Sequence, residues 1–549
     1  MDIWLENDLD RILPRDHQRD KPLFLHLRAF RGQRIYFQIG ISDSDYVAGK
    51  LKLYPVSSDF PVTENLQFFW QELVPLRYQT TQTPPDWLET VAPGFVPDVL
   101  LPIQPSADYA IKLSAGEMRG VWCDLQIPRD LAPGHYGITV IPFFEGNMRA
   151  ELRITLEIFD MILEKDTFPV TNWLDFDGLA AYYRLTGDVP EPPCLDIIGA
   201  YVRCLAEHGQ TMAWFPGFKT VDKLEKQQFS HVSVSVTNNG YEFDFEHLRK
   251  LVELYRQCGI LYFEMPFLTA GLGRAHHVLG NIKGELRPLW PENTAIFSAE
   301  HLRFISAYIP ALVQQLKALN IFQETKFHIA DEPPLSKLPD YLKFRELLRS
   351  LEPDIQVMDA LYNYRFAESR AVDLPVTQLY DIPTFEKYGA VSWAYICNYP
   401  RGTYPNRFLD YALHRQRVLG FVMARYNIKG FLHWGANFWW NVAPNGKTDG
   451  LANPYYVNDS QHWPEWYAGD PFVLYPGDQS PVVSLRLKVF KAALEDRKIM
   501  MALLQRKECR PEVERQLREV GSLDKMSNRS AGLGKAIQSL FECGKMAKA

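Results

Sequence analysis

The chain has 549 residues, 46% of them apolar and 13% aromatic, and at this length we expect about two to four globular domains. Its 59 Lys and Arg residues against 66 Asp and Glu residues give a net charge of −7. This balance leaves no basic surplus to neutralise a phosphate backbone, so we expect no nucleic-acid partner. The plentiful Trp, Tyr and Phe rings suit either a large core or the faces of sugar rings.

The seven cysteines form no CxxC or other close pair. We therefore expect reduced, buried thiols and no structural zinc site. No segment reaches the ~18 uninterrupted apolar residues of a membrane span, and the first 21 residues lack the apolar core of a signal peptide. These features predict a cytoplasmic protein without a membrane span; a chain whose leader had been removed would have the same sequence.

Residues 1–165 are predicted to form an N-terminal antiparallel β-sandwich. Apolar and polar residues alternate there with a period of two, and Gly, Pro, Asp and Asn separate the segments, as in sandwich strands. The alternating segments are PLFLHLRAFRG, RIYFQIGISDSD, GVWCDLQIPRD, HYGITVIPFFEGN and RAELRITLEIFD.

Residues 166–480 are predicted to form a catalytic (β/α)8 barrel of the TIM type. Short apolar runs alternate with amphipathic helical segments, which is typical of that fold. The expected strands cover residues 170–173, 212–215, 262–266, 327–330, 356–360, 376–379, 391–396 and 430–434. A doubly wound sheet is the alternative, but the Gly-rich first turn typical of that fold is not found.

The remaining residues, 481–549, are predicted to form a short helical tail that packs on the barrel. Within the barrel, Pro310 lies inside a long helical segment and should kink or break it.

A pair of adjacent carboxylates, Asp331 and Glu332, follows the fourth expected strand. Catalytic groups of barrel enzymes lie at the carboxyl ends of the strands, which distinguishes this pair from a solvated acidic loop. Pro333 should restrict Glu332 to an extended backbone. Adjacent carboxylates would approach a glycosidic bond from one side, whereas a retaining enzyme with a carboxylate nucleophile flanks the bond with groups ~5 to 5.5 Å apart. A 2-acetamido group of the substrate could then supply the nucleophile.

Longer motifs resemble glycoside hydrolase family 123, the β-N-acetylgalactosaminidases, and the wider group that shares their catalytic domain. The resemblance rests on HIADEP at 328–333, on NRF at 406–408 and on GFLHWGANFWWN at 430–441, followed by NPYYVND, GDPFVLYPG and SLRLKVFKAALEDRK. It implies that Asp331 is the stabilising carboxylate and Glu332 the acid/base of substrate-assisted hydrolysis. It also implies a glycan or glycolipid substrate that carries a 2-acetamido sugar, without a metal or organic cofactor.

Other residues near strand ends are candidate substrate contacts. Trp434 could stack on the sugar, Asn437 could bond its hydroxyls, and Tyr395 could donate to the acetamido carbonyl. Tyr362, Trp173, Glu264 and Asp381 rank lower, because an aromatic ring at such a position can belong to the core and an acid can form a salt bridge or a helix cap.

Two alternatives remain open. The first is a glycosidase of the same fold that acts on another sugar, and the second is a carbohydrate-binding protein without turnover. The sequence does not indicate the oligomeric state.

Overall fold

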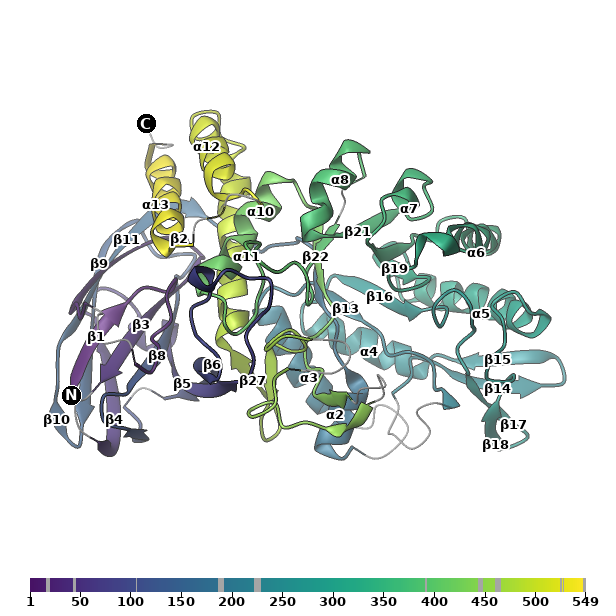
Figure 1. The fold of residues 1–549 in the computed structure, drawn as a ribbon, viewed down its shortest axis with the longest axis horizontal. Coiled ribbons are helices and arrows are strands. Elements are labelled where there is room, and N and C mark those ends of the chain that lie inside the picture. The colour runs from purple at the N-terminus through teal and green to yellow at the C-terminus, as the bar shows by residue number, and fades with distance from the viewer. Residues whose placement is uncertain are drawn as a thin grey trace.

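The computed structural model describes residues 1–15, 20–42, 46–104, 106–185, 192–221, 229–390, 393–442, 448–459, 466–523, 526 and 528–546. A β-rich N-terminal part lies at one end of the molecule, parallel strands and their helices lie at the other, and α11 (Leu485–Leu503) runs between them (Figure 1).

Two sheets form the N-terminal part. The first has the strand order β1 (Asp2–Glu6), β3 (Arg34–Ser42), β8 (Met118–Gln126), β5 (Leu66–Leu76), β6 (Gly94–Ile103), β27 (Pro481–Ser484) and β26 (Leu474–Pro476). The second has the order β2 (Phe24–Arg31), β11 (Leu152–Ile162), β9 (Gly134–Phe144), β4 (Val47–Val56) and β7 (Tyr109–Leu113), with β10 (Asn147–Met148) paired to β9. Alternate residues of both sheets, among them Ile39, Val121 and Leu156, enter one shared core.

This part differs from the expected sandwich in two respects. β2 and β11 pair in parallel, so the second sheet is not antiparallel throughout. In addition, β27 pairs with β6, and β26 pairs with β27. The first sheet therefore contains two strands, β26 and β27, that follow the parallel sheets in the sequence. The boundaries at 165 and 480 remain predictions.

Each of the eight expected strands overlaps a parallel strand of the structure, with bounds displaced by up to two residues, but the strands form two sheets. The five-stranded sheet has the order β12 (Val170–Asn172), β23 (Gly430–His433), β22 (Trp393–Tyr395), β21 (Leu374–Gln378) and β20 (Met358–Leu361). The three-stranded sheet has the order β13 (Met212–Trp214), β16 (Tyr262–Phe267) and β19 (Thr325–His328). Residues 391–392 of the expected seventh strand lie outside the described residues.

A closed eight-stranded barrel, which we expected, is not found in the described part of the chain. Between the sheets, Thr211 N donates to Val170 O at 3.1 Å, and Phe327 N donates to Gln356 O at 2.9 Å. At the first seam the Val170 N–H donates to the Thr211 side-chain hydroxyl rather than to a strand carbonyl, and at the second Phe327 and Val357 form only an isolated bridge, so neither seam continues as a ladder.

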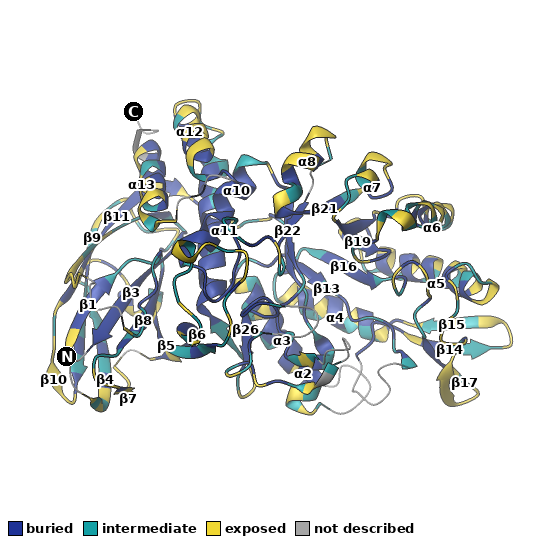
Figure 2. Ribbon diagram, in the orientation of Figure 1, coloured by how far each residue is buried: buried dark blue, intermediate teal, exposed yellow. Residues whose placement is uncertain are grey.

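Helices flank the parallel sheets. They are α2 (Phe176–Tyr183), α3 (Pro192–Glu207), α4 (Glu246–Gln257), α5 (Ala299–Ala318), α6 (Leu338–Leu351), α7 (Arg365–Glu368), α8 (Ile382–Lys387), α9 (Leu413–Arg417) and α10 (Leu419–Arg425). Buried residues concentrate on the strands and on the helix faces directed toward them (Figure 2). Pro310 does not break α5, which continues through it.

Smaller elements complete the fold. A four-stranded sheet is built from β15 (Gly240–Asp244), β14 (Ser233–Thr237), β17 (Leu279–Ile282) and β18 (Glu285–Pro288), and a two-stranded sheet from β24 (Trp440–Val442) and β25 (Thr448–Leu451). α1 (Val62–Asn65) and 3₁₀ turns at Pro85–Trp87, Leu335–Lys337 and Leu379–Asp381 lie in connecting segments.

The C-terminal helices contact both parts of the molecule. α11 packs on α9 and α10 and also contacts β3 and β6 of the first N-terminal sheet. α12 (Arg510–Val520) and α13 (Ser530–Met546) follow, and α13 covers β2 and β11, where the Phe541 ring lies 5.0 Å from Phe30. The seven cysteines form no disulfides. Among the described residues, no helix is both long and apolar enough to cross a membrane.

Candidate active site

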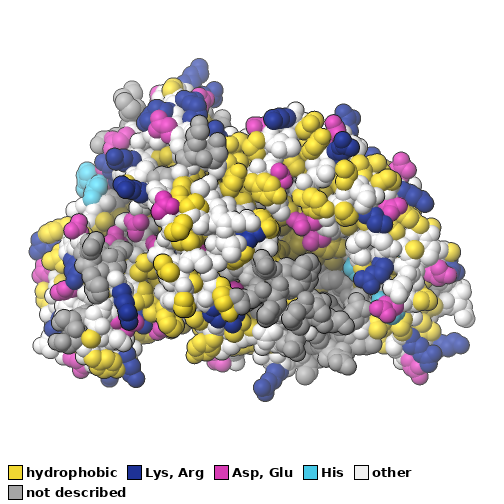
Figure 3. Space-filling model, in the orientation of Figure 1, with side chains coloured by type: hydrophobic (Ala, Val, Ile, Leu, Met, Phe, Trp, Pro, Cys, Tyr) yellow, Lys and Arg dark blue, Asp and Glu magenta, His cyan; other side chains and the backbone are white. Residues whose placement is uncertain are grey.

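Asp331 and Glu332 follow β19, at the edge where the carboxyl ends of the parallel strands lie. The ends of β12, β13, β21, β22 and β23 bring polar and aromatic side chains to the same edge. Figure 3 shows a hollow near the middle of this face, bordered by hydrophobic and acidic side chains. This edge is where barrel-like α/β proteins carry their chemistry.

The backbone before the pair is held by Asp359, a buried residue of β20. Its Oδ2 atom accepts hydrogen bonds from the backbone N–H groups of Ile329 at 3.0 Å and Ala330 at 3.3 Å. Glu332 then has a φ of 37°, in the left-handed region that few non-glycine residues adopt. The expectation that Pro333 would keep Glu332 extended is therefore wrong. The left-handed backbone gives the chain a sharp change of direction between Asp331 and Pro333.

Glu332 is directed toward the ends of β21 and β22. Its Oε1 atom accepts a short hydrogen bond from the Tyr395 hydroxyl and a longer one, at 3.4 Å, from the Gln378 side-chain amide. Tyr395 therefore contacts the candidate acid directly, whereas we had expected it to meet the substrate's acetamido carbonyl. Gln378 is a candidate site residue that the sequence analysis missed, although it lies within a predicted strand and ends β21.

Asp331 has different surroundings from Glu332. Its side chain is exposed to solvent, although many protein atoms lie around the carboxylate. Burial, together with the negative charges of Glu332 and Asp359, raises the pKa of Asp331 to about 7, against a smaller opposing effect of His328.

A fully buried charged network lies beneath the pair. His328 Nδ1 is 3.0 Å from Asp359 Oδ1, and His328 Nε2 is 3.2 Å from Glu264 Oε2. Although burial lowers the pKa of His328, hydrogen bonds and charges from both carboxylates prevail and raise it to about 9. His328 is therefore an imidazolium at neutral pH, with both N–H groups donating. The Tyr341 hydroxyl also donates to Asp359.

An aromatic cluster adjoins this network on the side of β12 and β13. Trp173 Nε1 donates to Glu264 Oε2 at 2.7 Å, and the Trp173 ring lies 4.7 Å from Trp214 and 5.6 Å from Phe267. Glu264 is thus an internal acceptor, in line with the salt bridge that was its alternative role. Trp214, which the sequence analysis missed, also lines a cavity of about 110 Å³ at the ends of these strands.

Trp434 follows β23 and is fixed by a buried acid. Its indole N–H donates to Asp470 Oδ2 at 3.1 Å, and its ring lies 4.8 Å from Trp466 and 5.4 Å from Phe438. Burial raises the pKa of Asp470 to about 7. The neighbouring His433 is fully buried, as expected of a packed histidine, and it accepts a short hydrogen bond from Arg407 of the NRF motif.

The three remaining candidates differ in their surroundings. Asn437 is buried. Its side-chain amide accepts a hydrogen bond from Asp175 N at 2.8 Å and donates one to Asp175 O at 3.0 Å. Because both bonds are made within the protein, they argue against the contact with sugar hydroxyls that we expected. Tyr362 is exposed just beyond β20. Asp381 is half-buried at the start of α8, and burial raises its pKa.

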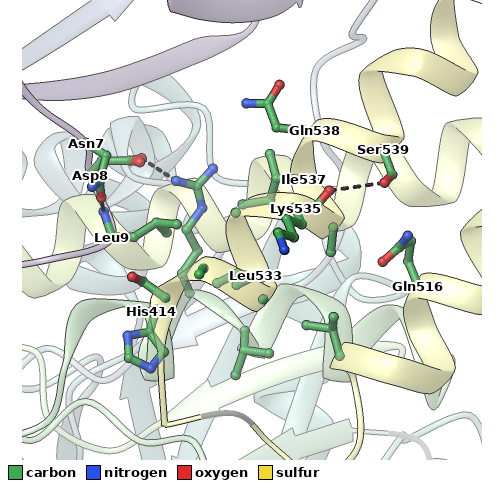
Figure 4. Close-up of a pocket in the computed structure, with 18 of the residues that line it drawn as sticks. Asn7, Asp8, Leu9, His414, Gln516, Leu533, Lys535, Ile537, Gln538 and Ser539 are labelled. Atoms are coloured by element: carbon green, nitrogen blue, oxygen red, sulfur yellow. Dashed lines mark hydrogen bonds and ion pairs between the residues drawn. The ribbon is translucent and has the colours of Figure 1, made fainter. Parts of the chain in front are cut away.

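A wide groove of about 1180 Å³ lies away from this site, between the N-terminal segment, α9, α12 and α13. Figure 4 shows Asn7, Asp8 and His414 on one side of it and side chains of α13 on the other. Arg417, which lines the groove, is paired with Asp8 and Asp496. Neither Asp331 nor Glu332 lines this groove. The candidate active site is therefore identified by its carboxylate pair and not by the size of a cavity.

Within the described ranges, no group of three or more His, Cys, Asp or Glu side chains is arranged to hold a metal ion. The residues of the candidate site are carboxylates, aromatic rings and amides, a combination that suits a carbohydrate bound by stacking and hydrogen bonds.

Comparison with known proteins defines the class as a hydrolase of glycosidic bonds. The model of the glycoside hydrolase 123 catalytic domain matches residues 173–503, more than half of the chain. The chain belongs to glycoside hydrolase family 123, which confirms the resemblance in the sequence.

Solved structures agree with this assignment. The chain is similar to a family 123 glycoside hydrolase from Clostridium perfringens, described for glycolipid glycan hydrolysis, with a TM-score of 0.76, 15% identity and coverage of 100% of this chain and 98% of the other. A family 5 mannosidase from Rhizomucor miehei matches with a TM-score of 0.33, 13% identity and coverage of 55% and 88%, too low a score to bear on the fold. No curated protein matches the chain.

Proposed function

We propose that this family 123 glycoside hydrolase is a retaining, exo-acting enzyme that releases β-linked N-acetylgalactosamine from glycans by substrate-assisted catalysis. In this proposal the acetamido carbonyl oxygen attacks the anomeric carbon while the bond to the leaving oxygen breaks, and Glu332 gives its proton to that oxygen. Water then opens the oxazolinium ring, and Glu332 takes the proton back.

The observation that carries this proposal is that two adjacent carboxylates have different partners. Glu332 is held by Tyr395 and Gln378, while Asp331 keeps an open side chain above the His328 network. A carboxylate with a free side chain can accept the acetamide N–H and stabilise the developing positive charge. Because neighbouring residues act from one side of the bond, the opposite face is left to a nucleophile that the substrate carries.

In this proposal the surrounding residues form the sugar pocket. Trp434 would provide an apolar face whose orientation Asp470 fixes, and the Trp173–Trp214 pair would provide a second one. We further propose that the two parallel sheets act together as the wall of a barrel around this pocket, because backbone hydrogen bonds link them at both seams.

Hydrolysis of a panel of nitrophenyl glycosides tests the function. We expect turnover of the 2-acetamido β-galactoside, slower turnover of its gluco epimer, and scarcely any of the 2-hydroxy β-galactoside. A thiazoline mimic of the cyclised intermediate should inhibit strongly. Preference for a sugar without a 2-acetamido group would support the same fold acting on another sugar, and binding without turnover of any glycoside would support a carbohydrate-binding protein.

Trapping separates the two retaining mechanisms. A covalent sugar ester on Asp331 or Glu332, detected by mass spectrometry, would contradict the substrate-assisted route. Retained configuration at the anomeric carbon, followed by NMR during hydrolysis and without such an ester, would support it.

A further inference from the structure

A fully buried ion pair joins the N-terminal sheet to α11, the helix that runs between the two parts of the molecule (Figure 1). Asp98 of β6 accepts two hydrogen bonds at 2.9 Å from Arg486, the second residue of α11, and a third at 2.6 Å from the Tyr475 hydroxyl. The side chains of Asp98 and Arg486 are both 0% exposed. A buried pair of this kind adds little net stability compared with apolar packing, but its bidentate geometry fixes the position of the guanidinium.

The third nitrogen of Arg486, Nη1, contacts two backbone carbonyls near the candidate active site. It donates a short hydrogen bond to Gly469 O and a longer one, at 3.4 Å, to Arg407 O. Gly469 has a φ of 91°, and a Cβ atom there would lie 2.7 Å from Nη1. Glycine therefore permits the close approach that fixes the backbone directly before Asp470.

Asp470 and His433 connect this contact to Trp434. Asp470 Oδ2 accepts the Trp434 indole N–H, and Asp470 Oδ1 lies 3.3 Å from His433 Nε2. His433 Nδ1 accepts hydrogen bonds from the Arg407 side chain and from Gly435 N. Burial and the charge of Arg407 lower the pKa of His433, so the neutral ring keeps its proton on Nε2, which faces Asp470. Both oxygens of Asp470 therefore face groups whose positions the protein fixes.

The residues between the N-terminal sheet and Trp434 are all buried, and only the Trp434 ring is partly exposed. Because a closely packed interior transmits displacements, a shift of Arg486 would move Asp470 and the ring that Asp470 holds. We propose that Asp98 and Arg486 are positioning residues of the active site, which hold the Trp434 ring in the orientation that binds the released sugar. This inference rests on the proposed function and gives the N-terminal part a role in it.

Steady-state kinetics of Asp98→Asn in the full chain tests the inference. Asparagine keeps the size of the side chain but removes the charge that holds the guanidinium. With the nitrophenyl 2-acetamido β-galactoside we expect KM to rise about threefold to tenfold while kcat changes little, as for a weakened aromatic contact with the sugar. Incomplete folding would instead lower the apparent kcat and leave KM unchanged, because KM does not depend on the amount of active enzyme.

A double-mutant cycle with Trp434→Phe shows whether the effect passes through Trp434. Phenylalanine has no N–H to donate to Asp470, so Asp98→Asn should raise KM by less than about twofold in that background. Arg486→Lys is a second variant for the case in which Asp98→Asn does not fold. Lysine keeps a positive charge near Asp98 but lacks the planar fork that also reaches Gly469, and it should give the same rise in KM.

Asp124→Asn is the matched control, because Asp124 of β8 forms a buried ion pair at 2.6 Å with Lys488, two residues beyond Arg486 on α11. This pair joins the same sheet to the same helix, but the Lys488 ammonium lies over the Phe69 ring of β5. The control should be destabilised as Asp98→Asn is, yet its KM should change by less than about twofold.

Three results would overturn the inference while leaving the proposed function intact. They are an equal rise in KM in Asp98→Asn and Asp124→Asn, an unchanged KM in both Asp98→Asn and Arg486→Lys, and a rise that persists undiminished in the Trp434→Phe background. Failure of the proposed function is distinguishable, because the wild type itself would then not hydrolyse this glycoside.

Discussion

The buried contact between His328 and Asp359 predicts a pH-dependent stability. Because its two carboxylate partners raise the pKa of His328 from the ordinary 6.5 to about 9, the imidazolium should contribute about 3 kcal/mol to the free energy of unfolding. A raised pKa means that the folded protein binds the proton more tightly than the unfolded chain. The contribution is therefore complete below about pH 6.5 and is lost as the pH rises through about 9.

Asp359→Asn is the perturbation that tests this account. Asparagine keeps one oxygen for the N–H groups of Ile329 and Ala330 but removes the charge that faces His328. We expect a loss of about 3 kcal/mol at pH 6, of the order found when a buried ion pair is broken, and a much smaller loss at pH 9.5. Urea unfolding or calorimetry of the wild type and the variant at both pH values measures the difference.

The control is Asp340→Asn, the same substitution in an exposed ion pair with Lys337 at 3.2 Å on the surface of α6. It should cost at most about 1 kcal/mol, as exposed pairs do. A deficit of Asp359→Asn that is equal at pH 6 and pH 9.5, or a wild-type stability that stays constant between those values, would refute the charged state assigned to His328.

Four further predictions concern the reaction. Glu332→Gln should lose kcat/KM heavily on natural glycans, whose alcohol needs a proton, and much less on an activated nitrophenyl glycoside. Asp331→Asn should lose about 2.7 to 4 kcal/mol of transition-state stabilisation, measured from kcat/KM, with both kinds of leaving group. Full activity of this variant would show that Asp331 takes no part in the mechanism. The proposed mechanism needs an ionised Asp331, so the wild-type kcat/KM should fall as the pH drops below about 7, the pKa of Asp331. In Glu332→Gln this fall should move to lower pH, because the negative charge of Glu332 no longer raises the pKa of Asp331. EDTA should leave activity unchanged, and a loss that a divalent cation restores would contradict a metal-free site.

The sequence allowed the strands to be predicted and the candidate catalytic pair to be proposed because both depend on local patterns. The apolar runs that became β19 and β20 are short and bounded by helical segments, and a carboxylate pair directly after such a run is visible without any structure. Asp359 carried a weaker signal of its own, an acid inside an otherwise apolar strand. Such a residue is buried only when a partner compensates its charge.

Several features depend on long-range register and could not be read from local patterns. The contact between Glu332 and Tyr395 joins residues 63 positions apart, and the bonds between Asn437 and Asp175 join residues 262 apart. The parallel pairing of β2 with β11 is likewise invisible to a period-two pattern, since alternation is the same in either direction. For Glu332, the preference of a residue before proline for extended backbone pointed to the wrong conformation, because tertiary contacts prevailed over it.

The left-handed backbone of Glu332 explains how two neighbouring carboxylates can do different work. On a regular strand they would point to opposite faces, and in a free loop they would share one environment. Here Asp359 anchors the chain just before the pair, and Tyr395 holds the Glu332 carboxylate after the turn. A conformation of this kind costs on the order of 1 to 3 kcal/mol, so it persists only where surrounding contacts impose it. The strain therefore falls at the point where, in the proposed mechanism, the chain directs one carboxylate toward the leaving group and leaves the other open to the sugar.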